Sequence, residues 1–149
     1  LWEHWEFSDN TYSHNHPMFG SVSQWFFNWL GGIQPDPKAV GFDRVVIRPQ
    51  IVGDLQWARC QYNSIRGPIV SAWRLDGRTL YLNVVVPPNV TATVYLPTAE
   101  TADVTESGKP LAQAPGVLLL GRESESLILE IQSGSYAFIG SMKRLQEEQ

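Results

Sequence analysis

The spacing of apolar residues changes once along the chain, close to a segment that contains two prolines. Before residue 34 the apolar residues recur three or four positions apart, and after residue 40 they mostly alternate with polar ones. The first spacing is typical of a helix, and alternation is typical of a half-buried strand. Pro35 and Pro37 lie between the two patterns and cannot continue a helix. The chain is therefore expected to be a helical segment followed by a β-rich part.

The first pattern predicts one helix from about Pro17 to Leu30. Proline suits the first turn of a helix, where its missing N–H costs nothing, and Gly31-Gly32 suits the end. Trp25 and Phe27 lie opposite the main apolar stripe, so the helix is apolar nearly all round and must be covered on more than one side. The stripe itself consists of Phe19, Val22, Phe26, Trp29, Leu30 and Ile33.

The second pattern predicts an antiparallel β-sandwich of about eight short strands, because short alternating segments follow one another without helices between them. Asp76-Gly77 is the strongest hairpin signal, since both residues tolerate a positive φ. The expected strands are Val45 to Arg48, Leu55 to Ser64, Ile69 to Leu75, Thr79 to Val86, Thr91 to Leu96, Ala102 to Thr105, Val117 to Leu120, Leu127 to Ile131 and Tyr136 to Ile139.

We interpret the chain as a mainly β protein of the α+β class with four parts. Residues 1–33 are a helical piece, 34–40 a linker, 41–141 the β-sandwich and 142–149 a polar tail. The length of 149 residues favours one principal core.

Composition excludes several classes of function. The net charge is −4 and charged residues make up 17% of the chain, so there is no basic surface for nucleic acid or for an anionic membrane. No apolar run reaches membrane-spanning length. A single cysteine, Cys60, cannot form an internal disulfide, and we expect a buried structural thiol. The apolar start at Leu1-Trp2-Glu3 favours the interior of a longer polypeptide. The sequence therefore does not indicate whether the protein is in the bacterial cytoplasm, in the periplasm or secreted.

The residues with the clearest chemical potential lie near the N-terminus. Glycoside hydrolysis needs a carboxylate to activate water, a carboxylic acid to protonate the leaving oxygen, and aromatic and hydrogen-bonding groups to hold the sugar. Glu3 supplies one carboxylate, Trp2 and Trp5 supply aromatic faces, and Asn15 and His16 supply polar groups. This set predicts part of a sugar-binding site and requires no cofactor.

Two other uses of these residues are disfavoured. Glu3 and Glu6 on one helix would have Cβ atoms about 5–6 Å apart on the same face. An inverting glycosidase needs carboxyl groups about 6.5–9.5 Å apart, on opposite sides of the sugar. His4, His14 and His16 could suggest a metal site, but His-x-His with scattered carboxylates is a weak signal, so we expect hydrogen-bonded polar residues instead.

Two motifs resemble a known family. Trp-Glu-x-Trp at residues 2–5 and Asn-His-x-x-Phe-Gly at residues 15–20 are similar to the last part of the catalytic domain of bacterial α-L-rhamnosidases, glycoside hydrolase family 78. Further similar segments lie at residues 41–49 and 86–97, with Trp57-Ala58, Tyr62-Asn63-Ser64, Gly67 and Trp73 between them, so the resemblance spans roughly two thirds of the chain.

The resemblance implies the closing piece of an (α/α)₆ barrel followed by a C-terminal β-sandwich domain. It implies that Glu3 is the general base of an inverting mechanism and that His16 lines the rhamnose site. The motifs of the family's general acid, Arg-Asp-Glu and Gly-Trp-x-Gly-Asp, do not occur in this sequence, and His4 stands where the family has arginine. We therefore expect that the whole enzyme removes terminal α-L-rhamnose from glycosides. The remainder of the barrel is then the partner of this segment, and this chain alone is expected to be inactive.

Two alternatives remain open. The sandwich is a non-catalytic carbohydrate-binding or structural module if Trp57 or Trp73 forms an exposed sugar platform, although strand tryptophans are more often buried. Under this alternative, Trp2 and Trp5 are aromatic residues in the core of a helical layer rather than parts of a sugar site. The chain is an oligomerising element if the uncovered helix pairs with a copy of itself.

Overall fold

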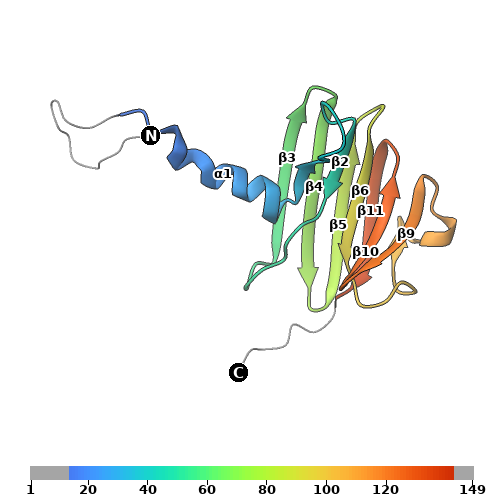
Figure 1. Cartoon of the computed structure of the whole chain (residues 1–149). Helices are drawn as coiled ribbons and strands as arrows, with labels where there is room; N and C mark the ends of the chain where they lie inside the picture. The colour runs from blue at the N-terminus through green and yellow to red at the C-terminus, as the bar shows by residue number, and fades with distance from the viewer. Residues whose placement is uncertain (1–13, 143–149) are drawn as a thin grey trace.

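The computed structural model describes residues 14–142, which form a two-sheet sandwich with one helix at its edge (Figure 1). This confirms the predicted mainly β class and the β-sandwich. The five-stranded sheet contains β1 (Ile33–Pro35), β2 (Arg44–Ile47), β6 (Thr91–Pro97), β10 (Ser126–Ile131) and β9 (Val117–Glu123), in that order. The six-stranded sheet contains β3 (Trp57–Ser64), β4 (Gly67–Asp76), β5 (Thr79–Val86), β11 (Gly134–Ser141), β7 (Thr105–Glu106) and β8 (Lys109–Pro110). A short 3₁₀ turn, η3 (Leu111–Gln113), connects β8 toward β9.

The core lies between the two sheets and follows the alternation of the strands. In β5 and β6 every second side chain points inward, which buries one face of each strand completely. Burying one such aliphatic side chain contributes about 1.5–3 kcal/mol. The inward-facing residues of these strands and of β10 are Leu80, Leu82, Val84, Val86, Ala92, Val94, Leu96, Leu127, Leu129 and Ile131.

The helix occupies the predicted residues, Pro17 to Leu30. It runs without interruption through η1 (Pro17–Gly20), α1 (Ser21–Trp25) and η2 (Phe26–Leu30). Its first part is a 3₁₀ turn and its last part a π turn, in which the amide of Gly31 donates to the carbonyl of Phe26 at 2.9 Å. The expected helix is thus confirmed, while the widened last turn was not foreseeable from the apolar spacing.

The strand β1 lies where a linker is predicted. Ile33–Pro35 pairs antiparallel with β2, so residues 34 and 35 belong to the sheet rather than to the linker 34–40. Proline cannot donate to a ladder, and β1 satisfies this constraint because it is the edge strand of its sheet.

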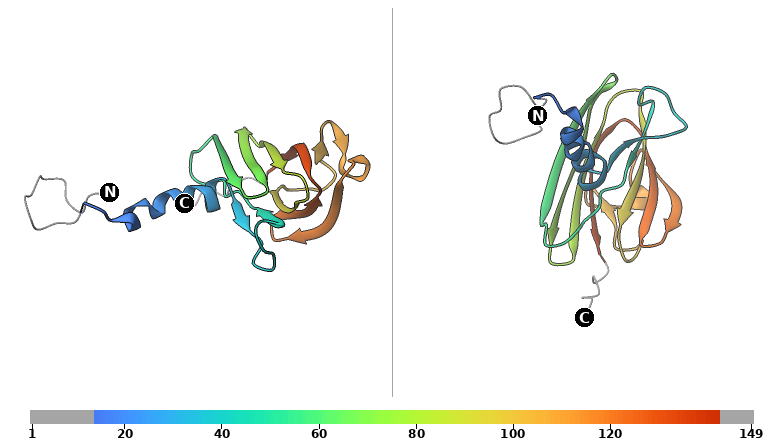
Figure 2. Two further views of the ribbon diagram at one scale, coloured as in Figure 1. Left: turned by 90° about the horizontal axis from the view of Figure 1, so that it is seen from above. Right: turned by 60° about the vertical axis from the view of Figure 1, so that its left-hand side comes forward.

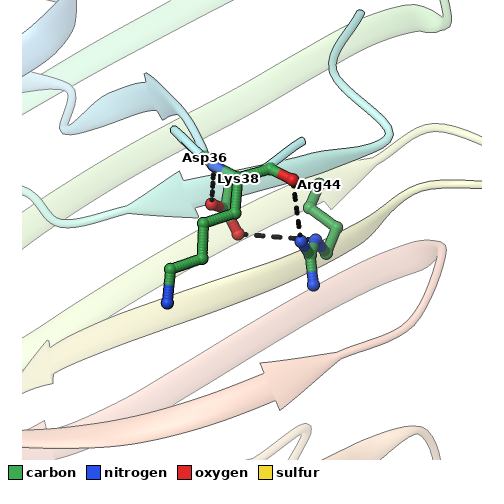
Figure 3. Close-up of polar contacts among 3 residues, drawn as sticks. All are labelled: Asp36, Lys38 and Arg44. Carbon is green, nitrogen blue, oxygen red and sulfur yellow. Dashed lines mark hydrogen bonds and ion pairs between the residues drawn. The ribbon is translucent and has the colours of Figure 1, made fainter. Parts of the chain in front are cut away.

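The turn after β1 is held by side chains (Figure 3). The carboxylate of Asp36 accepts a hydrogen bond from the backbone amide of Lys38 at 2.8 Å, and the guanidinium of Arg44 donates to the carbonyl of Lys38 at 3.1 Å. Arg44 and Asp36 also form an ion pair at 3.5 Å. Because the Arg44 side chain is half exposed, this pair contributes less than about 1 kcal/mol and serves mainly to shape the turn.

Two further differences from the predicted strands concern strand pairing and strand extent. β2 and β6 pair in parallel, from Arg44↔Thr91 to Ile47↔Val94, whereas we expect antiparallel neighbours. The chain leaves β2, builds β3, β4 and β5 in the other sheet, and returns at the same end. Residues 102–104 are not a strand, since only Thr105–Glu106 pairs, with β8 and β11.

The predicted hairpin around Asp76-Gly77 is confirmed, with its turn one residue later than expected. β4 and β5 pair antiparallel up to Asp76↔Thr79, which leaves Gly77-Arg78 as the two-residue turn. Gly77 has a φ of +57°, the conformation such a turn needs.

Candidate functional site

The C-terminal end of the helix is joined to the sandwich by several hydrogen bonds. The indole Nε1–H of Trp73 on β4 donates to the carbonyl of Leu30 at 2.8 Å. The amide of Gln50 donates to the carbonyl of Trp29, also at 2.8 Å. The amide of Arg48 donates to the carbonyl of Gly32 at the same distance. These bonds satisfy carbonyls that the end of a helix leaves without partners, and they fix the helix to the sandwich.

Two glycines permit this close contact. A Cβ on Gly31 would lie 2.5 Å from both Cβ and Sγ of Cys60 on β3. A Cβ on Gly32, whose φ is +69°, would lie 2.2 Å from the backbone of Arg48 and Pro49. Gly32 is therefore required to end the helix with a positive φ, and both glycines are required for the helix end to approach the sheets.

Cys60 lies directly under this junction. Its thiol donates a weak hydrogen bond to the carbonyl of Phe26 at 3.8 Å, and burial raises the pKa of the thiol. A raised pKa keeps the sulfur protonated and unreactive. This agrees with the expected structural thiol, although Cys60 is half-buried rather than fully enclosed.

A groove of about 480 Å³ runs along the junction. The rings of Phe27 and Tyr62 meet edge to face with centroids 6.5 Å apart, and those of Phe42 and Tyr62 lie 4.9 Å apart. Among residues 14–142, the groove is lined mainly by apolar and aromatic side chains, so it is suited to an apolar group. Its lining residues are Gln24, Phe27, Asn28, Ile33, Pro35, Phe42 and Tyr62.

Beyond the junction the helix extends away from the sandwich, as Figure 1 and the left view of Figure 2 show. Its apolar side chains are consequently exposed along most of its length. Met18 is 65% exposed and Trp29 47% exposed, near opposite ends of the helix. The others that stand in solvent are Phe19, Val22, Trp25, Phe26 and Phe27.

Of the predicted sugar-site residues, Asn15 and His16 lie among the residues that the structure describes. They immediately precede the helix, and His16 is its N-terminal capping residue. The imidazole of His16 stacks on the ring of Phe19 with centroids 5.4 Å apart, and the amide of Phe19 donates to the carbonyl of His16 at 3.2 Å. The Asn-His-x-x-Phe-Gly motif is therefore one local unit.

The other predicted site residues, Trp2, Glu3 and Trp5, lie outside the described residues 14–142. The separation of Glu3 from His16 and the roles of all five residues therefore stay predictions. Within residues 14–142, no group of three or more histidine, cysteine or acidic side chains could hold a metal ion. In the same part of the chain, no helix is long and apolar enough to cross a membrane.

The two sandwich tryptophans lie on opposite faces of the six-stranded sheet. Trp73 is 2% exposed and belongs to the core, as expected, whereas Trp57 is 67% exposed. The expectation that Trp57 is buried was therefore wrong. The sequence holds a signal that would have placed it correctly, because the polar residues Arg59 and Gln61 share its phase along the strand.

A comparison with protein families matches residues 32–110 to the model described as the bacterial alpha-L-rhamnosidase C-terminal domain. A curated relative, an alpha-L-rhamnosidase of Formosa agariphila, is 27% identical over 150 residues. The alignment covers 93% of this chain and 16% of the relative.

Solved structures give the same likeness. The structure of Streptomyces avermitilis alpha-L-rhamnosidase complexed with L-rhamnose superimposes with a TM-score of 0.77 at 29% identity, covering 93% of this chain and 13% of that one. The alpha-L-rhamnosidase from Dictyoglumus thermophilum superimposes with a TM-score of 0.76 at 32% identity, covering 95% and 16%. The chain thus spans less than a fifth of the length of each relative.

Proposed function

The chain belongs to the family of bacterial α-L-rhamnosidase C-terminal domains, and from this premise we propose that it is the last part of a glycosidase that removes terminal α-L-rhamnose from glycosides. The resemblance recognised in the sequence is confirmed at the level of the family. Under this proposal most of the enzyme, including its general acid, lies in polypeptide that precedes Leu1.

The exposed apolar helix carries the proposal. A helix that is apolar nearly all round normally lies inside a larger fold, where it is covered on several sides. Here the sandwich covers only its last turn, and Phe19, Trp25 and Trp29 stand in solvent. The likeness to the relatives covers 93% of the chain, so it extends beyond the family match at residue 32 into the helical segment. The preceding polypeptide of an (α/α)₆ barrel is the partner that fits this face.

The proposed chemistry is hydrolysis with inversion at the anomeric carbon. Glu3 acts as the general base and takes a proton from the water that attacks the sugar. The acid, on the other side of the sugar, protonates the leaving oxygen. His16 and Asn15 donate and accept hydrogen bonds with the rhamnose hydroxyls, while Trp2 and Trp5 supply aromatic faces that orient the ring.

The stereochemical outcome tests this mechanism. We expect the longer protein to release β-L-rhamnose first from an aryl α-L-rhamnoside, followed by mutarotation. Proton NMR of the anomeric region during the first turnovers distinguishes the anomers. Release of α-L-rhamnose as the first product would contradict inversion, and absence of hydrolysis would contradict the function.

The 149-residue chain alone should not hydrolyse the same substrate. Loss of one catalytic group of an acid–base pair costs about 10²–10⁴ in rate, and the whole opposite wall of the site is missing as well. The assay needs the Glu3→Gln variant as its control. Turnover by the chain alone that Glu3→Gln abolishes would show that the acid lies within these residues.

A further inference from the structure

We propose that the outer face of β3, β4 and β5 binds a pyranose sugar in a hollow above Ala72, with Trp57 as the stacking surface. This site is separate from the hydrolytic site proposed above. It lies on the solvent side of the six-stranded sheet, whereas the helix is attached through Cys60 and Trp73, which point to the other side.

The register of the three strands builds the site. Trp57 pairs with Arg74, and Arg74 pairs with Tyr81, so these three side chains form one row across the outer face. The next row, two residues further along each strand, contains Arg59, Ala72 and Asn83. Side chains in neighbouring rows on one face point the same way.

The hollow arises because the smallest of these residues lies in the middle. The methyl group of Ala72 is flanked by the long Arg59 and by Asn83 in its own row, and by Arg74 in the row beside it. A depression of about 410 Å³ is found there, lined by both rows and floored by the strands themselves. Small-molecule sites typically occupy clefts of about 300–1,000 Å³, so the depression has room for a single sugar ring.

Its side chains are suited to a sugar. A pyranose presents C–H groups on one face and hydroxyls around its edge. Trp57 offers a broad apolar ring surface that is 67% exposed. Asn83 carries both a donor and an acceptor, and the planar guanidinium of Arg59 carries several donors. Among residues 14–142, Arg59 forms no ion pair with a carboxylate, so its donors are available to a ligand.

One wall of the hollow is already held in place. The guanidinium carbon of Arg74 lies 4.2 Å from the centre of the Tyr81 ring. Arg74 also forms an ion pair with Asp76 at 3.3 Å. These contacts restrict the side chain before any ligand arrives, which lowers the entropic cost of binding.

The same observations disfavour a protein partner on this face. Protein–protein docking sites are marked by contiguous apolar patches. Among residues 14–142, runs of exposed large apolar side chains lie on the helix and at Leu118–Leu120 of β9, not around the hollow. On the outer face Trp57 stands instead among Arg59, Arg74 and Asn83, which form a polar rim around one aromatic surface.

The test is an NMR titration of the 149-residue chain with methyl α-L-rhamnopyranoside, methyl β-D-glucopyranoside and methyl β-D-glucuronide as probes. We expect saturable shifts of the Trp57 indole N–H and the Ala72 amide with at least one of them. The shifts should vanish in Trp57→Ala and in Ala72→Leu, which fills the hollow but keeps the aromatic ring. Trp25→Ala is the matched control, because Trp25 is also exposed, at 45%, yet lies on the helix.

Each outcome decides the inference. Amide spectra that match those of the unaltered chain show that the variants are folded. Absence of saturable shifts at Trp57 and Ala72 with all three sugars would overturn the proposed site, as would shifts that persist in both variants. Shifts confined to Asn15 and His16 would also contradict this site, while supporting the rhamnose site assigned to the helical segment. The titration can therefore reject the sugar site on the outer face without rejecting the proposed rhamnose site, and the reverse.

Discussion

The indole Nε1–H of Trp73 donates a hydrogen bond to the backbone carbonyl of Leu30 across 43 positions of sequence, at 2.8 Å. This bond joins a buried core residue of β4 to the last residue of the helix. It explains how a helix whose apolar side chains are mostly exposed is nevertheless fixed to the sandwich. It also means that the helix and the core are energetically linked.

Trp73→Phe tests this link. The change keeps an aromatic ring in the core but leaves the Leu30 carbonyl without its indole donor, which costs about 1–3 kcal/mol of unfolding free energy. Urea denaturation monitored by circular dichroism measures the loss. Trp57→Phe is the matched control, because the ring on the outer face is solvent-exposed, and it should change stability by less than about 0.5 kcal/mol. Equal losses in the two variants would contradict the assignment.

Gly31→Ala should destabilise the chain through a steric clash alone. Gly31 has a φ of −75° and a ψ of −28°, which alanine adopts readily, so backbone strain does not contribute. The added Cβ would lie 2.5 Å from Cys60, and overpacking of this kind costs about 1–3 kcal/mol. Gly20→Ala is the control, since no atom lies within 4 Å of a Cβ there. A Gly31→Ala variant as stable as Gly20→Ala would show that the helix end is less closely packed than described.

Cys60 should react slowly with iodoacetamide in the folded chain. Burial raises the pKa of its thiol, so at mildly alkaline pH the folded chain holds less thiolate than the unfolded chain in urea. The stability that comes from keeping the thiol protonated is present below the pKa of the unfolded thiol and is lost as the pH rises through the folded value. Alkylation rates in both states, and denaturation at rising pH with Cys60→Ser as control, measure the two effects. Equal rates would refute the assigned burial.

The exposed apolar helix should make the isolated chain self-associate. Phe26 is 46% exposed on this face, and removing such surfaces from water drives association. Phe26→Asp should lower the weight-average mass measured by light scattering. Val52→Asp is the control, because Val52 is similarly exposed, at 42%, but lies in the loop before β3. A mass unchanged by Phe26→Asp would mean that any association uses another surface.

Features governed by local sequence were predictable. The helix begins and ends as expected at Pro17 and Leu30, because proline, the glycine pair and the apolar spacing act within a few residues. The strand Thr79–Val86 is correct to the residue, since its alternation is uninterrupted. The hairpin between β4 and β5 follows from the positive φ that Gly77 adopts.

Features that depend on distant partners were not predictable. Ile33–Pro35 becomes a strand only because β2 offers an edge at which Pro35 needs no donor. The parallel pairing of β2 with β6 depends on the path of the chain through the other sheet. Trp57 was expected to be buried because tryptophan usually is, although its polar neighbours in phase, Arg59 and Gln61, indicate the outer face.

The candidate site divides in the same way. The Asn-His motif is local, and within it the ring of His16 stacks on that of Phe19, while the roles of Asn15 and His16 stay predictions. The expectation that Glu3 and His16 face the same bound sugar requires further polypeptide to form the opposite side of the site. It therefore rests on the family resemblance.

The most direct measurement is the kcat/KM of the longer protein for an aryl α-L-rhamnoside, compared between Glu3→Gln and Glu6→Gln. Both substitutions remove one negative charge at nearby positions, but only Glu3 is assigned to the attacking water. The account predicts a loss of about 10²–10⁴ for Glu3→Gln, the usual worth of a general base, and little change for Glu6→Gln. Equal activity of the two variants, close to that of the unaltered enzyme, would contradict it.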